Sequence, residues 1–294
     1  MTRVLFCGLA TLDFVLGVDA IPTTAEKHRA REAEIVGGGG AANAAVAAAR
    51  LGAEAALACR LGADAVGDMI AEGLAREGVS LDLSPRSPGG RSAFSAVCVD
   101  RAGERMIVNF RGEGLSDDPG VLEAAGPFDA ALADTRWPEG AEALMRLAAA
   151  RGVPGVIDAE TPVCEPALRA ASHVAFSAQG LRGWIGAEDD AALREAARRC
   201  GGWICVTDGP EGVRVAEDDG VRRVPGFRVA AVDTLGAGDV WHGAFALALA
   251  EGVAETPAAR FANAAAALKC ARRGGRAGAP RRAEVEAFLK EHTP

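Results

Sequence analysis

Several features that would assign a protein class directly are missing from these 294 residues. The 7 cysteines form no CxxC pair and the 4 histidines complete no metal-binding spacing, so neither a zinc site nor a disulfide framework is expected. The net charge of −8 leaves no broad basic field, which argues against nucleic-acid binding. No stretch approaches the roughly 18 uninterrupted apolar residues of a membrane-spanning helix. Reduced thiols and the lack of a clean signal peptide favour a cytoplasmic protein.

Hydrophobic residues make up 49% of the chain, enough to bury a large core in one domain. Apolar runs alternate with helical patterns, and this alternation predicts an α/β fold with a mostly parallel central sheet flanked by helices. We expect helices at 43–51, 64–77, 139–152 and 187–200, and strands in RVLFCG, AALACRLG, DAALADT, PGVIDAE, HVAFSAQ and WICVTDG. In such folds the ligand site lies at the carboxyl ends of the strands.

Two regions depart from this alternation. Residues 14–35 are mixed and partly alternating, and residues 92–110 read as a hairpin of two strands around DRAGER. Neither region has a helix of its own to cover it. We therefore expect both to pair as a small β-sheet lid beside a single domain of residues 1–294. The stretch AEDDGVRRVPGF predicts a further short hairpin.

Glycine gathers in three informative stretches. In VGGGGAANAAVAAARLG, residues 36–52, Asn43 is expected to open a helix as its N-cap. VTDGPEGV, residues 206–213, follows a predicted strand and by itself indicates a turn. In DTLGAGDVWHGAFALAL, residues 233–249, Gly236 and Gly238 are expected at a helix start, because glycine weakens a helix interior. A helix start offers unpaired N–H groups that suit an anion.

In their order and spacing, the three stretches resemble those of the PfkB family of carbohydrate kinases, which have the ribokinase-like fold. GGGGAANAAVAAARLG is similar to the family's amino-terminal signature, and DTLGAGD to its carboxy-terminal one. The resemblance implies that Asp239 is the base that takes a proton from a sugar hydroxyl attacking ATP. It also implies that the N–H groups of Gly236, Ala237 and Gly238 form an anion hole for the transferring phosphoryl group. Asp233 would hold the loop or a cation near it.

On the nucleotide side, the resemblance implies contacts from Thr207, Gly209 and Gly212, and it places Asn263 near adenine. Mg²⁺ is expected with ATP. The N-x-x-E motif with which many relatives organise that ion is absent, and SAQG stands there at residues 177–180. Phosphates and water can still hold the ion. Many relatives also respond to K⁺, and RRGGRAGAP lies where that loop would be, without assignable ligands.

On the sugar side, the resemblance implies that Asp13, Gly39 and Asn43 lie beside the sugar. Relatives often dimerise through the lid sheet, whose edge strands would otherwise stay open. A homodimer formed through the lid is therefore expected.

Three polar residues could meet at one end of the sugar if the lid closes. Lys27, Asn109 and Arg136 together suit an anionic group. Taken singly, they read as a solvated side chain, a turn-closing amide and a partner for a carboxylate such as Glu139. However, GLATLDFVLGVDAIPTTAEKHRAR, GERMIVNF, LADTRW, HVAFSAQGL and ALKCARRGGRAG resemble the sulfofructose kinase branch of the family. That branch phosphorylates 6-deoxy-6-sulfofructose at its 1-hydroxyl and holds the sulfonate with a lysine, an asparagine and an arginine, which correspond to these three residues.

Other functions stay open at this point. Fructose, fructose 6-phosphate, tagatose 6-phosphate or a ketodeoxy sugar acid could replace the sulfonated sugar, and a sugar phosphate is the hardest competitor because its shape is similar. A catalytically silent sugar- or nucleotide-binding protein is disfavoured because the residues from Gly236 to Asp239 are intact. A nicotinamide oxidoreductase is weaker still, since GLATLD rather than G-x-G-x-x-G follows the first strand.

Overall fold

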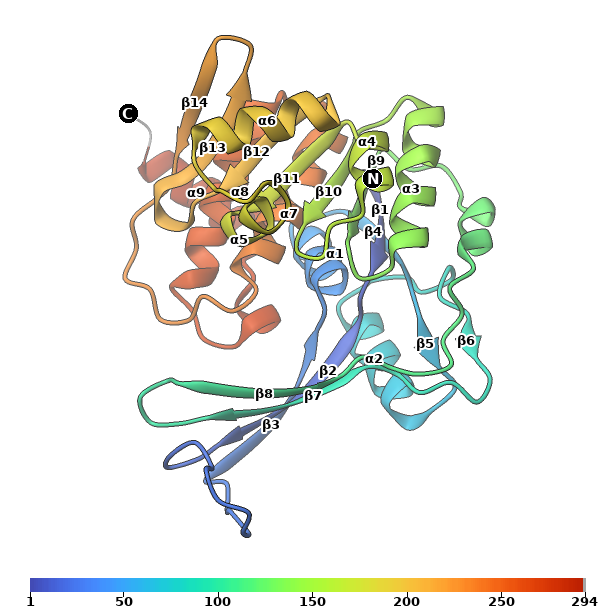
Figure 1. The fold of residues 1–294 in the computed structure, drawn as a ribbon, viewed down its shortest axis with the longest axis vertical. Helices are drawn as coiled ribbons and strands as arrows, with labels where there is room; N and C mark the ends of the chain where they lie inside the picture. Colours follow the sequence, from blue (N-terminus) through green and yellow to red (C-terminus); the bar gives the residue numbers. More distant parts are fainter. Residues whose placement is uncertain (293–294) are drawn as a thin grey trace.

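The computed structural model describes residues 1–292 and has an eight-stranded sheet (sheet A) between two layers of helices (Figure 1). The strand order is β14-β13-β12-β11-β10-β9-β1-β4. The parallel strands are β1 (Arg3–Gly8), β4 (Glu54–Cys59), β9 (Ala130–Asp134), β10 (Gly155–Ala159), β11 (His173–Ser177) and β12 (Trp203–Thr207). An antiparallel hairpin of β13 (Gly212–Glu217) and β14 (Gly220–Pro225) closes one edge. This architecture confirms the predicted α/β fold.

Strand side chains alternate between the two faces of sheet A, so each face has its own core. On β1, Val4 and Phe6 join the core on one face, and Leu5 and Cys7 join the other. The first core packs against α1 (Gly40–Arg50), α7 (Ala237–Ala250) and α8 (Glu255–Cys270), with α9 (Arg282–Glu291) beyond α8. The second packs against α3 (Pro138–Arg151), α4 (Glu165–Ala170), α5 (Ala178–Ile185) and α6 (Asp190–Cys200). Three short 3₁₀ turns, η1 (Pro119–Ala124), η2 (Gly209–Glu211) and η3 (Gly275–Gly278), complete the connections.

Helices α1 and α7 approach each other closely, because small residues face one another where the two helices pack. A Cβ atom added at Gly243 of α7 would overlap the backbone carbonyl of Ala44 in α1. The alanine-rich sequence of α1 permits the same approach from its side. This close packing brings the first turns of the two helices together at the carboxyl end of sheet A, where Asn43 and Asp239 meet.

The small lid sheet (sheet B) has the strand order β3-β2-β7-β8 and projects from the carboxyl-end side of sheet A (Figure 1). Its strands are β2 (Thr11–Gly17), β3 (Glu32–Gly38), β7 (Phe94–Val99) and β8 (Arg105–Phe110). The predicted hairpin around DRAGER is confirmed as β7 and β8, which pair antiparallel. Helix α2 (Ala65–Arg76) packs against part of sheet B, and a separate pair, β5 (Leu61–Gly62) and β6 (Arg86–Ser87), lies beside it.

Two local expectations were wrong. AALACRLG is not one strand: β4 ends at Cys59, the last residue in register with β1, and Leu61–Gly62 belongs to another sheet. Asn43 is not an N-cap, because α1 already begins at Gly40. The helix starts early since the carboxylate of Asp134 accepts the N–H of Ala41 and so takes the place of a capping side chain. In the described part of the chain, no helix is both long and apolar enough to cross a membrane.

Candidate active site

Helix α7 starts as the glycine pattern predicts. Its N-cap is Gly236, whose φ of 75° lies in the left-handed region that favours glycine. The Ala237 N–H donates to the carbonyl of Thr234 at 3.2 Å, whereas the helix itself provides no carbonyl for the N–H groups of Gly236 and Gly238. Asp239 lies in the same first turn. The first turn of α7 therefore carries both the Asp239 carboxylate and two backbone N–H groups, those of Gly236 and Gly238, that could donate hydrogen bonds to an anion.

A short chain of hydrogen bonds orients the Asp239 carboxylate. Asn43 Nδ2 donates to Asp239 Oδ2 at 2.6 Å, and Arg276 Nε donates to Asn43 Oδ1 at 2.9 Å. Because arginine can only donate, it fixes the Asn43 oxygen toward itself and the Asn43 NH₂ group toward Asp239. Arg276 is held in turn by the carbonyl of Gly38 at 2.9 Å. Arg276 belongs to the RRGGRAGAP stretch, and sequence reasoning gave it no role.

The environment of Asp239 suits a base that works near neutral pH. Desolvation is the main cause that raises its pKa from 3.8 to about 7, and the nearby carboxyl of Asp158 raises it further. The hydrogen bond from Asn43 and the proximity of His242 act in the opposite direction. Burial also raises the pKa of Asp158 well above its ordinary value and lowers that of His242, whose Nε2 lies 3.5 Å from Asp158 Oδ1. A carboxylate tuned in this way can both accept and release a proton at physiological pH.

Asp134, at the end of β9, ties three segments of the site together. It is 4% exposed, and its Oδ2 accepts the N–H groups of Leu9 and Ala41, both at 2.9 Å. Its Oδ1 accepts the N–H of Arg136, also at 2.9 Å. The carboxylate thus fixes the loop after β1, the start of α1 and the turn after β9. Sequence reasoning missed Asp134, although a polar residue at the end of a buried strand was visible in LADTRW.

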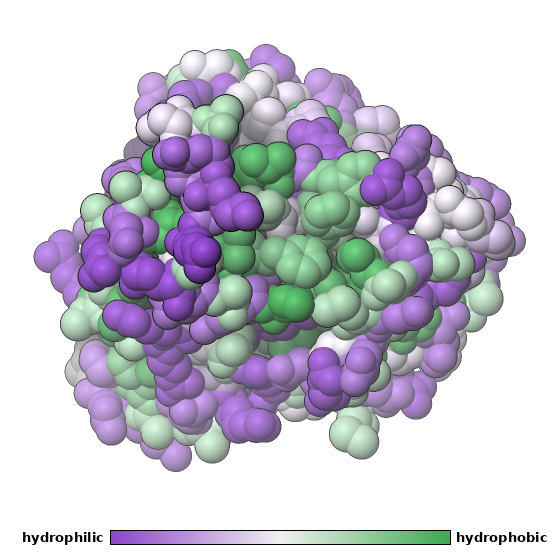
Figure 2. Space-filling view, turned by 90° about the horizontal axis from the view of Figure 1, so that it is seen from below, coloured by the Kyte–Doolittle hydropathy of each residue, from purple (hydrophilic) through white to green (hydrophobic). Residues whose placement is uncertain are grey.

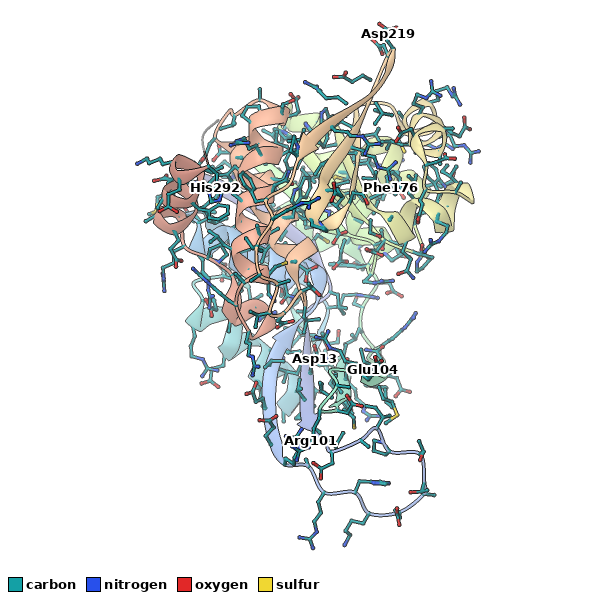
Figure 3. The ribbon with its side chains drawn as sticks, turned by 90° about the vertical axis from the view of Figure 1, so that its left-hand side faces the viewer. Asp13, Arg101, Glu104, Phe176, Asp219 and His292 are labelled. Carbon is teal, nitrogen blue, oxygen red and sulfur yellow. The ribbon has the colours of Figure 1, made fainter. Side chains whose placement is uncertain are left out.

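The sugar-side residues of the lid form a row on one face of sheet B. Asp13 of β2, Ser95 of β7 and Asn109 of β8 are in register, and Asn109 Nδ2 donates to Ser95 Oγ at 3.1 Å. Figure 3 shows Asp13 where the lid meets the main body. Desolvation raises the pKa of Asp13, against the hydrogen bond from Ser95 and the charge of Arg276. Gly39, with φ 95°, packs so closely on the carbonyl of Leu9 that a Cβ atom would overlap it.

Three arginines face a narrow recess at the carboxyl end of β1. Arg60 pairs with Asp117 and donates to the Arg136 carbonyl at 2.9 Å, and Arg136 Nη1 donates to the carbonyl of Thr161 at 2.8 Å. Within residues 1–292, the guanidinium of Arg111 has no hydrogen-bond or ion-pair partner. Sequence reasoning identified Arg136 but missed the other two. The recess is lined by Gly8, Leu9, Arg60, Ala93, Arg111, Leu115, Arg136 and Trp137, and we call it the arginine recess.

The three residues expected to hold an anion are only partly brought together. Arg136 lines the arginine recess with Arg111, which directly follows the end of β8 at Phe110. Asn109 lies on β8 two residues before Arg111, in register with Ser95, and is not among the residues that line the recess. Lys27 is exposed in the loop between β2 and β3. That loop is tethered through Asp19 to Arg101, far from the main body (Figure 3). Lys27 is therefore not part of the recess in this conformation.

The expected nucleotide turn lies at the carboxyl end of β12. Thr207 ends the strand and its Oγ1 donates to the carbonyl of Phe176 at 3.3 Å. Gly209 begins η2, and Gly212 begins β13. The turn therefore sits three strands away from β9 along the same edge of sheet A.

Both the oxygen and the nitrogen of the Asn263 side-chain amide form hydrogen bonds with other groups of the protein. It is 5% exposed, its Oδ1 accepts from Trp241 Nε1 at 2.8 Å, and its Nδ2 donates to the carbonyls of Val224 and Pro225 at 3.2 and 3.0 Å. These bonds join α8 to α7 and β14. The geometry makes Asn263 a support for this region rather than a free ligand group.

The residues around Asp239 do not form a ready-made magnesium site. Ser177 Oγ accepts the N–H of Gly180 at 2.9 Å and so serves as the N-cap of α5. Among the described residues, no three histidine, cysteine, aspartate or glutamate side chains are grouped to hold a metal ion. The carboxyl groups of Asp158 and Glu160 lie near enough to interact electrostatically. The described residues therefore provide carboxyl groups near the site but no set of direct ligands, so the ligands of a magnesium ion would come from the ATP phosphates and water.

Comparisons with known proteins identify the family of the chain. The model of the pfkB family of carbohydrate kinases matches residues 1–282. The chain is 30% identical to the ribokinase of Bacillus subtilis, over 98% of this chain and all (100%) of that protein. It is 32% identical to the ATP-dependent ribose-1-phosphate kinase of Halopiger xanaduensis, over 99% of both chains. A solved structure from Agrobacterium tumefaciens, provisionally described as a ribokinase, superposes with a TM-score of 0.89 at 36% identity, over 99% of this chain and 98% of the other. The chain therefore belongs to the pfkB family of carbohydrate kinases and is an ATP-dependent sugar kinase.

Proposed function

We propose that Asp239 is the general base of phosphoryl transfer from ATP to a sugar hydroxyl. The carboxylate takes the hydroxyl proton while the sugar oxygen bonds to the γ-phosphorus and the bond from that phosphorus to the bridging oxygen of ADP breaks. The N–H groups of Gly236 and Gly238 stabilise charge on the transferring group, and the N–H of Ala237, which was also expected to do so, instead donates to the carbonyl of Thr234 at 3.2 Å and shapes the turn between them. The hydrogen bond of 2.6 Å from Asn43 supports this role, because it aims one carboxylate oxygen and leaves the other available.

Magnesium bound to the ATP phosphates would neutralise part of their charge, with Asp158 and Glu160 nearby to orient its water ligands. Thr207, Gly209 and Gly212 would contact the nucleotide phosphates from the end of β12. Asn263 would shape the adenine side through Trp241. Asp13, Gly39 and Asn43 would bind sugar hydroxyls opposite Asp239.

We further propose that the sugar carries an anion at the end away from Asp239, and that it is 6-deoxy-6-sulfofructose, phosphorylated at its 1-hydroxyl. The observation that carries this proposal is the unpaired guanidinium of Arg111 beside Arg136 in the arginine recess. A sulfonate stays ionised at physiological pH and would pair with both groups, and the amide of Asn109, two residues before Arg111 in the chain, would complete its contacts. Lys27 would join when the loop between β2 and β3 folds back over bound sugar. One relative is named for an anionic sugar, ribose 1-phosphate.

Ribose is the second candidate, because the Bacillus subtilis relative is a ribokinase and shares the full length of the chain. The two candidate sugars differ in whether they carry a negative charge that the arginine recess could bind. A neutral pentose would leave Arg111 and Arg136 without an anionic partner, whereas the sulfonated ketose would satisfy both.

Steady-state kinetics with Mg-ATP test the proposal. We expect Arg136→Ala and Arg111→Ala each to raise the KM for 6-deoxy-6-sulfofructose about 10- to 100-fold, since a hydrogen bond to a charged group contributes about 1.5–3 kcal/mol. The KM for fructose should change little. The control is Arg76→Ala, which removes an exposed arginine of α2 paired with Glu72. If the KM for 6-deoxy-6-sulfofructose is unchanged in both variants, the proposal that the arginine recess binds an anionic group of the sugar is wrong.

We also propose that two copies pair through sheet B in the cytoplasm. Ile35, Ile107 and Val108 of its edge strands are 53%, 59% and 64% exposed, which is unusual for large apolar side chains. The side of the molecule seen from below has an apolar area at its centre, rimmed by hydrophilic residues (Figure 2). The 7 cysteines, all unpaired, fit a reducing compartment. Analytical ultracentrifugation should show a dimer for the wild-type chain and a monomer for Ile107→Glu, because the substitution places a charge on the exposed apolar edge of sheet B.

A further inference from the structure

Lys269 is a fully buried cation beside the loop that carries the anion hole. It lies in the last turn of α8, and its side chain is 0% exposed. Its Nζ donates to the carbonyl oxygen of Asp233 at 2.7 Å and lies 3.4 Å from Asp233 Oδ2. A buried ammonium is costly unless it is paired, and both of these contacts go to a single residue. Sequence reasoning gave Lys269 no role.

Asp233 joins two loops through its remaining contacts. Its Oδ1 accepts the N–H of Leu235 at 2.9 Å, which shapes the turn leading to Gly236. Its Oδ2 accepts the N–H groups of Gly274 and Gly275 at 3.0 and 3.2 Å. The Asp233 side chain therefore fixes the backbone between β14 and α7 to the loop after α8, together with the N–H groups of Val232 and Asp233, which donate to the carbonyl of Cys270 at 2.7 and 3.1 Å. The hydrogen bonds that the Asp233 carboxylate accepts, with the charge of Lys269, lower its pKa to about 2 despite partial burial. A second cation, Arg105 of β8, lies 3.6 Å from Asp233 Oδ1 on the lid side.

This junction is where the resemblance to other pfkB kinases led us to expect an effect of K⁺. Potassium needs a shell of oxygen atoms, largely backbone carbonyls, in place of its water. Here the carbonyl of Asp233 already accepts from Lys269, and the carboxylate of Asp233 accepts three backbone N–H groups. A metal cation at these oxygens would also lie against the ammonium group. The residues present therefore do not fit a bound K⁺ at Asp233.

We infer that Lys269 is a built-in cation that orders the anion-hole loop, so that this kinase works without a monovalent metal ion. The ammonium group binds the carbonyl and the carboxylate of Asp233. It neutralises this carboxylate, which links the backbone before α7 to the loop after α8. Lys269 is a positioning residue, since it acts on the phosphoryl group only through the backbone from Asp233 to Gly236. The inference rests on the sugar kinase activity, but it concerns the loop and not the identity of the sugar.

The wild-type protein gives the first test. The rate should differ less than twofold between 100 mM KCl and 100 mM NaCl, and the melting temperature should be equal in the two salts. A rate increased tenfold by K⁺, or a melting temperature raised by K⁺ and not by Na⁺, would overturn the inference. The melting temperature decides the matter even if the sugar tested is the wrong one, because it needs no substrate.

Two variants provide the second test. Lys269→Ala removes the charge and opens space beside Asp233, and we expect at least a tenfold loss of kcat, partly restored by K⁺ or methylammonium but not by Li⁺. Lys269→Met removes the charge but fills the space, so its rate should stay low in every salt. Lys290→Ala, at an exposed position of α9, is the control. A Lys269→Ala variant that folds and keeps full activity in sodium salts would contradict a positioning role.

Discussion

Replacing Asp239 by asparagine should abolish turnover and at the same time stabilise the folded protein. In this variant an amide of the same size replaces the carboxyl group, and its oxygen can still accept the hydrogen bond from Asn43 but cannot take a proton from the sugar hydroxyl. General-base catalysis contributes about 10²- to 10⁴-fold, so kcat should fall by at least that factor while ATP binding persists. In the wild-type protein kcat/KM should rise tenfold per pH unit and level off above pH 7, where the group is ionised.

The effect on stability follows from the same pKa. Asp239 has a pKa of about 7 in the folded chain and 3.8 in the unfolded one. Between these values the folded chain holds a proton that the unfolded chain has released, so raising the pH favours unfolding. The full difference corresponds to about 4 kcal/mol, and solvent at the partly exposed carboxyl should reduce it to about 1–3 kcal/mol.

Urea unfolding at pH 5 and pH 8, together with initial rates, measures both effects. Asp239→Asn should exceed the wild-type free energy of unfolding at pH 8 by about 1–3 kcal/mol, and by less at pH 5. Near-normal turnover in this variant would refute the assignment of Asp239 as the base. A stability difference that does not grow with pH would refute the desolvated carboxyl on which the raised pKa depends.

Two other variants probe how the site is held. Asn43→Ala removes the donor that lowers the pKa of Asp239, so the midpoint of the pH profile of kcat/KM should move above 7, with about a tenfold loss of rate at neutral pH. Asp134→Ala leaves the buried N–H groups of Leu9, Ala41 and Arg136 without their acceptor, and should lower the free energy of unfolding by about 2–5 kcal/mol in urea melts. An unshifted pH midpoint, or an unchanged urea midpoint, would contradict the corresponding role.

The parts of the fold that the sequence predicts are those set by short-range patterns. The buried runs of sheet A and the glycines at the start of α7 are local signals, and the structure confirms both. The start of α1 was misplaced because its cap is not local: Asp134 lies 93 residues from Ala41. A capping side chain that comes from another strand leaves no trace in the sequence around the helix.

In the candidate site too, the residues of one local motif could be predicted from the sequence, whereas residues brought together only by folding could not. The aspartate and glycines of DTLGAGD stand in one short motif, so sequence resemblance could identify them. Arg276 and Asn43 are 233 residues apart, and only the close packing of the folded chain makes one orient the other. Arg111 was missed because only the folded chain brings the residue after β8 to the same recess as Arg136, and Lys27 was overestimated because its loop has no pattern that fixes its path.

A competition experiment tests the central claim about the substrate most directly. Equal concentrations of 6-deoxy-6-sulfofructose, fructose 6-phosphate, fructose and ribose are incubated with the protein, magnesium and a limiting amount of ATP, and the products are separated by mass. The arginine recess predicts that the sulfonated 1-phosphate dominates, with fructose 6-phosphate as the nearest rival and the neutral sugars far behind. Ribose phosphate as the main product would contradict the anion in the recess and favour a ribokinase.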